Sequence, residues 1–164
     1  MGWSRITPNI MALREQEKSR EWKMNHKIVV KDDQKEDIYA DILAHSVNKA
    51  APKWKELVRI SMTKALEEAK AHPEYHWLEA YLDGKSVGDC YILCHNGCIE
   101  LDDLNVDKEV RKQYIATTLM KYVAENFDGL IYVHAAINRT PKDMYAKMGF
   151  EIVETSYEYF MEWE

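Results

Sequence analysis

One stretch, LNVDKEVRKQYIATTLM at residues 104–120, constrains the fold of this chain more than any other. An apolar-alternating run ends at Val106, a charged linker follows, and apolar positions from Ile115 onward recur with helical spacing. The first amides of a helix lack intrahelical partners and lie at the positive end of the dipole, so they attract phosphates, and Arg111 and Lys112 would strengthen that attraction. The stretch predicts a phosphate-bearing cofactor site, although a basic helix start is also compatible with a solvated surface.

The length and composition of the sequence restrict the class of protein. A chain of 164 residues with 46% hydrophobic and 30% charged residues suits one globular domain with a core of ordinary size. No apolar run is long enough for a membrane span, and charged residues interrupt the first 23 residues, which therefore do not resemble a signal peptide. We therefore expect a cytoplasmic protein with no membrane partner.

The net charge of −6 argues against a nucleic-acid binder that relies on bulk charge, and it agrees with a cationic substrate such as an amine. The even spacing of Cys90, Cys94 and Cys98 invites a metal-site interpretation. However, Asn96-Gly97 is a strong two-residue hairpin signal, and it would pair Cys94 with Ile99 and put Cys98 on the opposite face from Cys90 and Cys94. Three thiolates on two faces cannot converge on one ion, so we expect reduced thiols and no metal.

The hydrophobic patterns predict a mixed order of strands and helices within a single domain over residues 25–164. Residues 1–24 are expected to be an N-terminal extension, in which 9–23 could form a helix that begins at Asn9. Strands are predicted at residues 27–31, 76–82, 86–95, 98–106, 130–136, 150–155 and 157–163, and helices at 34–51, 53–71, 112–126 and 142–148. Turns at Asp83-Gly84 and Asn96-Gly97 make the centre an antiparallel meander.

This order resembles the GNAT superfamily of N-acetyltransferases over most of the chain, and two local patterns carry the resemblance. In the first, Val106 is followed by Arg111, by Tyr114 and Ala116 at two positions that are usually small, and then by a Leu-containing helix. In the second, Asn138 is followed by Tyr145 and by Gly149-Phe150. The resemblance implies an α/β (α+β) fold with a mixed, mostly antiparallel central sheet flanked by helices on both faces. Tyr114 stands where the family usually has glycine.

The resemblance also implies a site for acetyl-CoA, used as a co-substrate, and a direct attack of a neutral amine on its thioester. Leu104 and Val106 would pair with the pantetheine arm through their backbone groups. The residues implied in cofactor binding are Leu104, Asn105, Val106, Arg111, Lys112, Gln113, Tyr114, Ile115, Ala116, Thr117, Asn138 and Tyr145.

Tyr145 is implied as the general acid that protonates the leaving thiolate; without the resemblance it would be read as a packed aromatic. Asp102 and Asp103 are the candidate bases, and Asp102 is preferred, with Glu100 also considered. Alternation places Glu100 and Asp102 on one face with Leu104 and Val106, and Asp103 on the other. These acids could equally anchor a cationic substrate or only solubilise a groove. His134, in an apolar strand, fits a hydrogen-bonded core residue better than a catalytic one.

Aromatic residues in or after the two early helices are expected mostly in the core, and in part around an acceptor pocket suited to an amine. They are Trp54, Tyr75, His76, Trp77 and Tyr81. The favoured function is acetyl transfer to a primary amine of a small molecule or protein. The alternatives are a GNAT-fold protein that binds CoA or acyl-CoA without efficient transfer, which Tyr114 would permit, and a non-enzymatic interaction module. Exposed late strands would also allow a homodimer.

Overall fold

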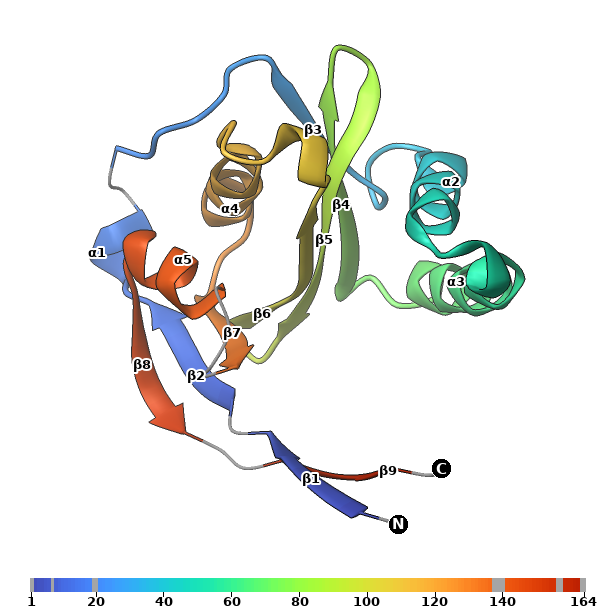
Figure 1. The fold of residues 1–164 in the computed structure, drawn as a ribbon. Helices are drawn as coiled ribbons and strands as arrows, with labels where there is room; N and C mark the ends of the chain where they lie inside the picture. The colour runs from blue at the N-terminus through green and yellow to red at the C-terminus, as the bar shows by residue number, and fades with distance from the viewer. Residues whose placement is uncertain (1, 7, 19–20, 137–140, 156–157, 163–164) are drawn as a thin grey trace.

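A seven-stranded sheet with helices on both faces forms the body of the protein (Figure 1). The computed structural model describes residues 2–6, 8–18, 21–136, 141–155 and 158–162. The strand order in the sheet is β3-β4-β5-β6-β7-β2-β8, and β6–β7 is the parallel pair among otherwise antiparallel neighbours. The strands are β2 (Pro8–Leu13), β3 (Ile28–Asp32), β4 (Tyr75–Leu82), β5 (Lys85–His95), β6 (Cys98–Val106), β7 (Leu130–Ala136) and β8 (Phe150–Thr155). The predicted fold class is therefore confirmed.

The meander β4-β5-β6 follows from two tight turns. Asp83 and Gly84, and likewise Asn96 and Gly97, all have positive φ angles between 50° and 78°, the conformation that a two-residue hairpin turn requires. The second turn sets the register, and it pairs Cys94 with Ile99 as the sequence predicts. A separate two-stranded sheet pairs β1 (Gly2–Ile6) with β9 (Glu158–Glu162) and projects from the body in Figure 1.

The helices divide between the two faces of the sheet (Figure 1). On one face lie α2 (Tyr39–Lys49), the 3-10 turn η1 (Pro52–Trp54) and α3 (Lys55–Lys70); on the other lie α4 (Ile115–Asn126) and α5 (Pro141–Lys147). The larger part of the core packs α4 on the sheet through side chains such as Leu119 and Val123, and a smaller cluster holds α2 and α3 through Ile42, Leu66 and Trp77. No described helix is long and apolar enough to cross a membrane.

The helix expected over residues 9–23 is wrong. Residues 8–13 form β2, which pairs with β7 on one edge and β8 on the other, and only Glu15–Lys18 is helical (α1). Met11 and Leu13 are buried in the main core. A short apolar run such as Ile10 to Leu13 has no periodicity that separates strand from helix, and pairing with strands more than 100 residues away decides between them. Residues 8–13 thus lie inside the sheet of the domain that was predicted to begin at residue 25.

Two helix starts also differ from the prediction. The helix expected from residue 34 begins at Tyr39, because the amides of Lys35 and Glu36 bond to the carbonyl of Asp32 and form a turn instead. The helix expected from residue 112 begins at Ile115, because Lys112 and Tyr114 both have positive φ. The remaining predicted elements match within a few residues.

Candidate active site

An opening between β6 and β7 is the most distinctive feature of the sheet. The two strands pair only from Cys98 to Leu101 on β6 and from Leu130 to Val133 on β7. Beyond Leu101, β6 continues to Val106 in contact with β5, and β7 continues to Ala136 in contact with β2, without described pairing between them. The facing edges therefore offer free backbone groups to an extended ligand, as an added strand would use them.

A β-bulge lies where this opening begins. Asp89 pairs with Asn105 and Tyr91 with Asp102, so Asp103 and Leu104 face the single residue Cys90 on β5. Asp103 has a φ of 46°, and its amide donates to the carboxylate of Asp102 over 2.9 Å. A bulge of this kind redirects side chains next to functional openings.

The bulge also shifts the alternation of β6, so the predicted common face for Glu100, Asp102, Leu104 and Val106 is wrong. Before the bulge Ile99 and Leu101 face the main core, and after it Leu104 and Val106 pack against that core. The amide of Asp107 donates to the carbonyl of Val87 on β5. By alternation, the backbone groups of Leu104 and Val106 then point away from β5 and toward the opening, as their implied role requires.

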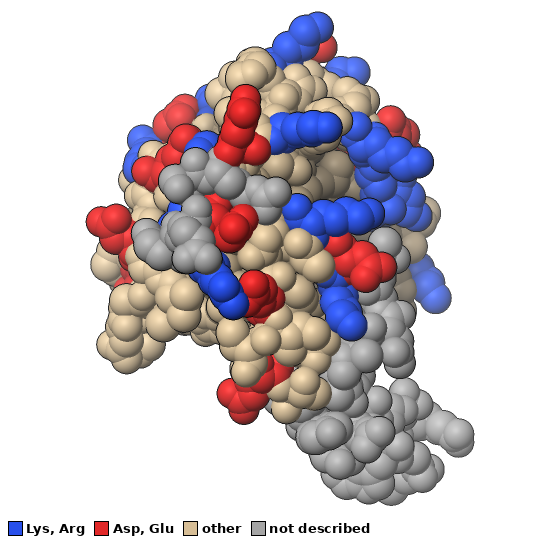
Figure 2. Space-filling view, turned by 90° about the vertical axis from the view of Figure 1, so that its left-hand side faces the viewer, with Lys and Arg blue, Asp and Glu red and all other residues tan. Residues whose placement is uncertain are grey.

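The turn after β6 supplies backbone amides and basic side chains. Arg111, Lys112, Gln113 and Tyr114 are exposed, and α4 begins after Tyr114 without a side-chain cap on its first amides. The guanidinium of Arg111 donates to the carbonyl of Val106 over 3.3 Å and ties the turn to the end of the strand. Figure 2 shows Lys and Arg side chains gathered around a hollow on one face of the molecule. Uncapped helix amides and nearby cations make a fitting cradle for phosphate groups.

Tyr114 occupies the position where the family usually has glycine, and the structure shows why glycine suits it. Its φ is 63° and its ψ 21°, the left-handed conformation that residues with a Cβ adopt at a cost. The side chain is 47% exposed, so the phenol lies toward solvent and does not fill the turn. Ala116 and Thr117 are partly exposed in the first turn of α4, whereas the side chain of Ile115 is buried and only its amide is available.

Close packing fixes the start of α4 against the end of β6. A Cβ added to Gly88 on β5 would lie 2.8 Å from the carbonyl oxygen of Asn105 and 3.0 Å from a methyl group of Ile115. Only glycine therefore allows β5, β6 and α4 to approach each other this closely, and this contact positions the amides of the turn relative to the opening.

Tyr145 is buried on α5, 5% exposed, and its ring packs against Phe150 with centroids 5.3 Å apart. Burial raises the pKa of the Tyr145 phenol, and the nearby Cys90 and Asp102 raise it further. The phenol therefore stays protonated at neutral pH, as a proton donor must. Asn138 lies outside the described residues.

Acidic groups line β6 at the bulge and before it. Asp102 and Asp103 are both exposed. The surrounding protein reduces the hydration of the Asp103 carboxyl, and this loss of hydration raises its pKa, as do the charges of Asp102 and Asp89. Tyr132 on β7 donates to Glu100 over 2.8 Å, and the ring of His134 lies 3.6 Å from Glu100. His134 is thus a half-exposed partner of a carboxylate and not the core residue that was predicted. Tyr132 was not predicted as a site residue, because only the parallel register of β6 and β7 brings it next to Glu100.

The early aromatic residues separate into different environments. Tyr75 and Tyr91 stack with centroids 5.5 Å apart, and Trp77 packs against Tyr91 beside the small core cluster. Trp54 is 50% exposed on η1. Tyr81 donates its hydroxyl to Asp41 on α2 over 2.8 Å. Of the predicted aromatic residues, Tyr75 and Trp77 thus share one cluster through Tyr91, and a role in an acceptor pocket stays a prediction.

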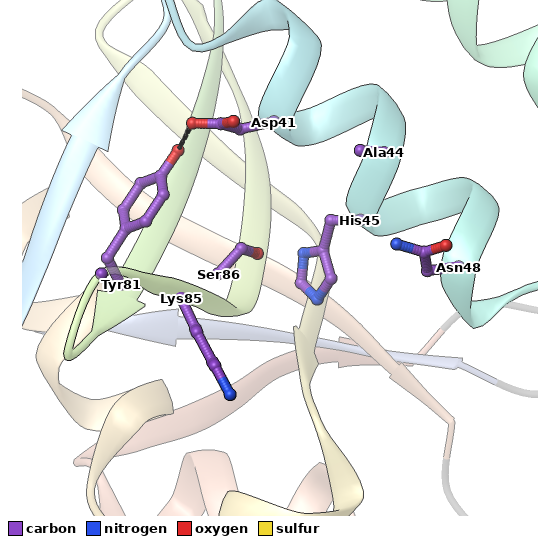
Figure 3. A pocket seen from close by; sticks show the side chains of 8 residues that line it. Asp41, Ala44, His45, Asn48, Tyr81, Lys85 and Ser86 are labelled. Carbon is purple, nitrogen blue, oxygen red and sulfur yellow. Dashed lines mark hydrogen bonds between the residues drawn. The ribbon is translucent and has the colours of Figure 1, made fainter.

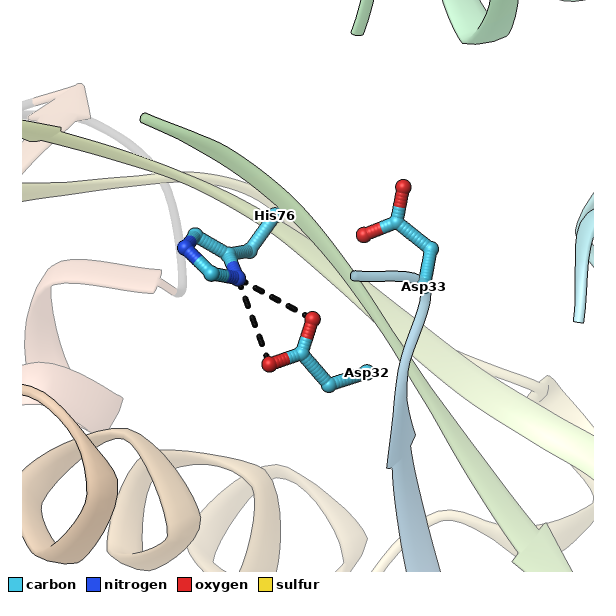
Figure 4. A group of neighbouring side chains, drawn as sticks. All are labelled: Asp32, Asp33 and His76. Atoms are coloured by element: carbon cyan, nitrogen blue, oxygen red, sulfur yellow. Dashed lines mark hydrogen bonds and ion pairs between the residues drawn. The ribbon is translucent and has the colours of Figure 1, made fainter. Parts of the chain in front are cut away.

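His76 belongs to a group with Asp32 and Asp33 whose donor atoms all lie within 4.8 Å of one another. Figure 4 shows the His76 ring facing Asp32, and Nδ1 of His76 lies 3.0 and 3.2 Å from the two oxygens of Asp32; the Asp33 carboxylate lies beside them without a drawn contact to either. One oxygen of Asp33 accepts from the amide of Trp77 over 2.7 Å. These contacts link the end of β3 to β4, and this structural role accounts for the group.

Comparison with known proteins agrees with this architecture. Residues 73–152 match a family model described as an acetyltransferase (GNAT) domain. This part of the chain is a GNAT domain. It holds β4 to β6, the basic turn, α4 and Tyr145, so the opening and the turn both lie inside the matched region. No curated protein matches the chain.

Solved structures share the GNAT fold at low sequence identity. A functionally unknown conserved protein from Staphylococcus epidermidis is 19% identical with a TM-score of 0.77, over 96% of this chain and 62% of that protein. A protein from Novosphingobium aromaticivorans assigned to the GNAT family is 12% identical with a TM-score of 0.60, over 94% and 63%. A tandem GNAT protein from the clavulanic acid biosynthesis pathway is 16% identical with a TM-score of 0.66, over 94% and 53%. The chain therefore spans about half to two thirds of the length of these three chains.

Proposed function

We propose that this chain is an acetyl-CoA-dependent N-acetyltransferase that acts on a primary amine of a small molecule or protein. The single observation that carries the proposal is the opening between β6 and β7, which ends at an uncapped, basic helix start. Free backbone groups at Leu104 and Val106 suit an extended amide-bearing arm. Amides from Arg111 to Thr117, with the side chains of Arg111 and Lys112, suit a diphosphate. The fit of both parts to one ligand favours a CoA thioester over a ligand without phosphate.

The acidic residues on β6 support an amine as the acceptor. Asp102, Asp103 and Glu100 attract an ammonium group, and one carboxylate must remove its proton before the nitrogen can attack. We assign the base role to Asp103, because its pKa is raised toward the range in which a general base works near neutral pH. The bulge sets the position of this residue. The Asp102 carboxylate accepts a hydrogen bond from the backbone amide of Asp103, so its main role is to stabilise the bulge. This assignment reverses the preference for Asp102 that the sequence suggested.

The ammonium form of the amine first gives one proton to Asp103, which passes it to solvent. The neutral nitrogen then forms a bond to the carbonyl carbon, the carbon–sulfur bond breaks, and Asp103 takes the second proton that the nitrogen loses. Tyr145 donates its proton to the departing sulfur and is reprotonated before the next turnover. A buried phenol beside Cys90 and Asp102 is held neutral for this step.

The first experiment is thermal unfolding with acetyl-CoA and with desulfo-CoA. A ligand at about 100 times its Kd stabilises a fold by about 2.7 kcal/mol, which is a readily measured shift. A shift with both ligands, followed by thiol release with a panel of amines, supports the enzyme. A shift without thiol release for any amine would favour a CoA-binding protein that does not transfer, and no shift at millimolar ligand would contradict a CoA site.

Tyr145→Phe tests the acid. The variant keeps the ring packing against Phe150 and loses only the hydroxyl, so we expect CoA binding to persist and kcat to fall by about 10²-fold or more. The measurement is kcat against pH, in which the limb that reports the acid should disappear. Tyr132→Phe is the matched control, since it removes a phenol from β7 with no assigned proton transfer. Equal losses in both variants would remove Tyr145 from the acid role.

A further inference from the structure

A second polar site, separate from the opening, lies between α2 and the sheet. His45 on α2, Glu79 on β4 and Asp89 on β5 are 9%, 0% and 7% exposed, and one donor atom from each lies within 4.8 Å of the others. His45 Nδ1 is 2.5 Å from Glu79 Oε1 and 3.6 Å from Asp89 Oδ1. Three elements thus bring one imidazole and two carboxylates together in a buried position.

Each of these three side chains is oriented by a further polar group. His45 Nε2 lies 3.1 Å from Asp107 Oδ1, so the second ring nitrogen is held by a carboxylate. Ser86 donates its hydroxyl to Glu79 Oε1, and the Asn105 amide donates to Asp89 Oδ2 over 3.3 Å. A carboxylate on the far nitrogen of an imidazole and hydrogen bonds to the acids are the outer shell that surrounds metal ligands in proteins.

One atom of the cluster has no partner. Glu79 Oε2 is buried and makes no hydrogen bond to any described residue, although a buried, unsatisfied carboxylate oxygen is costly. The charges are also unbalanced: Glu79, Asp89 and Asp107 face the single ammonium of Lys49, which lies 2.5 Å from Asp89 Oδ1. A metal on His45 Nδ1 would displace the proton that this nitrogen now shares with Glu79. With the imidazole then neutral, the three carboxylates and Lys49 leave two negative charges, the charge that one divalent cation cancels.

A cavity borders the cluster on the side of His45. His45 and Ser86 line a cavity of about 320 Å³ between α2 and the β4–β5 hairpin, together with Asp41, Tyr81 and Lys85. Figure 3 shows the His45 ring projecting from α2 into this space, near Ser86. Lys49 is 34% exposed, so its ammonium can leave Asp89 for solvent without unfolding the helix.

We propose that His45, Glu79 and Asp89 bind a divalent first-row transition metal such as Zn²⁺, with an open position toward the cavity. A nitrogen and carboxylate oxygens are donors that such ions accept, and three protein ligands leave room for a water or a small ligand. This site departs from the metal-free expectation, and none of its three ligands is a residue assigned to acetyl transfer.

The test is metal binding by the full chain after treatment with a chelator. Equilibrium dialysis against Zn²⁺ should leave one bound ion per chain, and Co²⁺ should give visible absorption stronger than that of the hydrated ion. Glu79→Gln keeps the side-chain volume and should weaken binding by more than about 100-fold, and Asp107→Asn by about 10- to 100-fold. Both variants keep the shape of the core, and circular dichroism establishes that they fold.

Two further variants separate a metal site from an ion-pair network. Lys49→Met removes the competing ammonium and should tighten metal binding. If the cluster were only an ion-pair network, the same substitution would lower the stability of the fold and leave metal binding absent. His72→Ala is the control, since His72 forms a surface pair with Glu74 at 3.2 Å, and it should leave binding unchanged. Absence of a stoichiometric ion, or equal affinity in the wild-type and Glu79→Gln proteins, would overturn the proposal.

Discussion

At the scale of single residues, the turn before α4 depends on a tyrosine in the conformation that favours glycine. Tyr114 has a φ of 63° and its side chain is 47% exposed, so little packing offsets the strain. Tyr114→Gly should raise the free energy of unfolding by about 1 kcal/mol and should not weaken CoA binding. Urea denaturation measures the first effect. Gln113→Gly is the control: its φ is not positive, so it should destabilise, and equal effects would exclude strain at Tyr114.

Two neighbouring carboxyl groups at the end of β3, Asp32 and Asp33, should respond oppositely to pH. Burial alone would raise the pKa of Asp32, but hydrogen bonds from His76 and the Gln34 amide lower it below the usual value. Burial and the charge of Asp32 raise the pKa of Asp33, although the bond from Trp77 opposes this. An ionised Asp32 therefore stabilises the fold at neutral pH, and this stability is lost as the pH falls through its folded pKa; an ionised Asp33 destabilises the fold above its unfolded pKa.

We expect Asp32→Asn to lower the free energy of unfolding at pH 7 by about 1.5 to 3 kcal/mol, since it removes a charged hydrogen-bond partner. Asp33→Asn should raise it by a smaller amount, because the amide oxygen can still accept from Trp77. Unfolding curves from pH 7 down to pH 3 should show both differences shrinking. Changes of the same sign at pH 7 would contradict this assignment.

At the scale of elements, β2 completes the sheet although it comes from the first 13 residues. It separates β7 from β8 and buries Met11 and Leu13 in the core. Leu13→Ala should cost about 2 to 5 kcal/mol, as removal of a fully buried side chain does. Arg14→Ala is the neighbouring control and should cost at most about 1 kcal/mol, since its ion pair with Glu151 is exposed. A small effect of Leu13→Ala in urea denaturation would mean that β2 is dispensable.

At the scale of the whole molecule, net charge and local charge make opposite predictions for an anionic ligand. The chain carries −6, which repels a CoA thioester, while Arg111 and Lys112 at the start of α4 attract it. Salt screens both the repulsion by the net charge and the attraction by Arg111 and Lys112, but these two cations lie nearest to the phosphates, so the loss of their attraction should dominate. We therefore expect the Kd of acetyl-CoA to rise several-fold from 50 mM to 500 mM salt, with a weaker dependence in Arg111→Ala. A Kd that falls with salt would show that net repulsion dominates.

Local signals in the sequence determined much of this protein. The positive-φ turns at Asp83-Gly84 and Asn96-Gly97 set the meander, and the change from strand to helical spacing after Val106 located the basic turn. These features involve residues close together in the chain, so residue type and spacing carry the information. The candidate cofactor residues from Leu104 to Thr117 follow from this local pattern together with the family resemblance, and their role stays a prediction.

Tertiary structure alone decided the rest, because it depends on contacts between distant segments. The place of β2 rests on pairing with β7 and β8, and the bulge at Asp103 appears only as a register shift against β5. The cluster of His45, Glu79 and Asp89 joins α2, β4 and β5, three segments whose separate patterns show no ligand spacing. Such convergence depends on strand register and helix placement, which the free energy of the whole core sets and which no local pattern specifies.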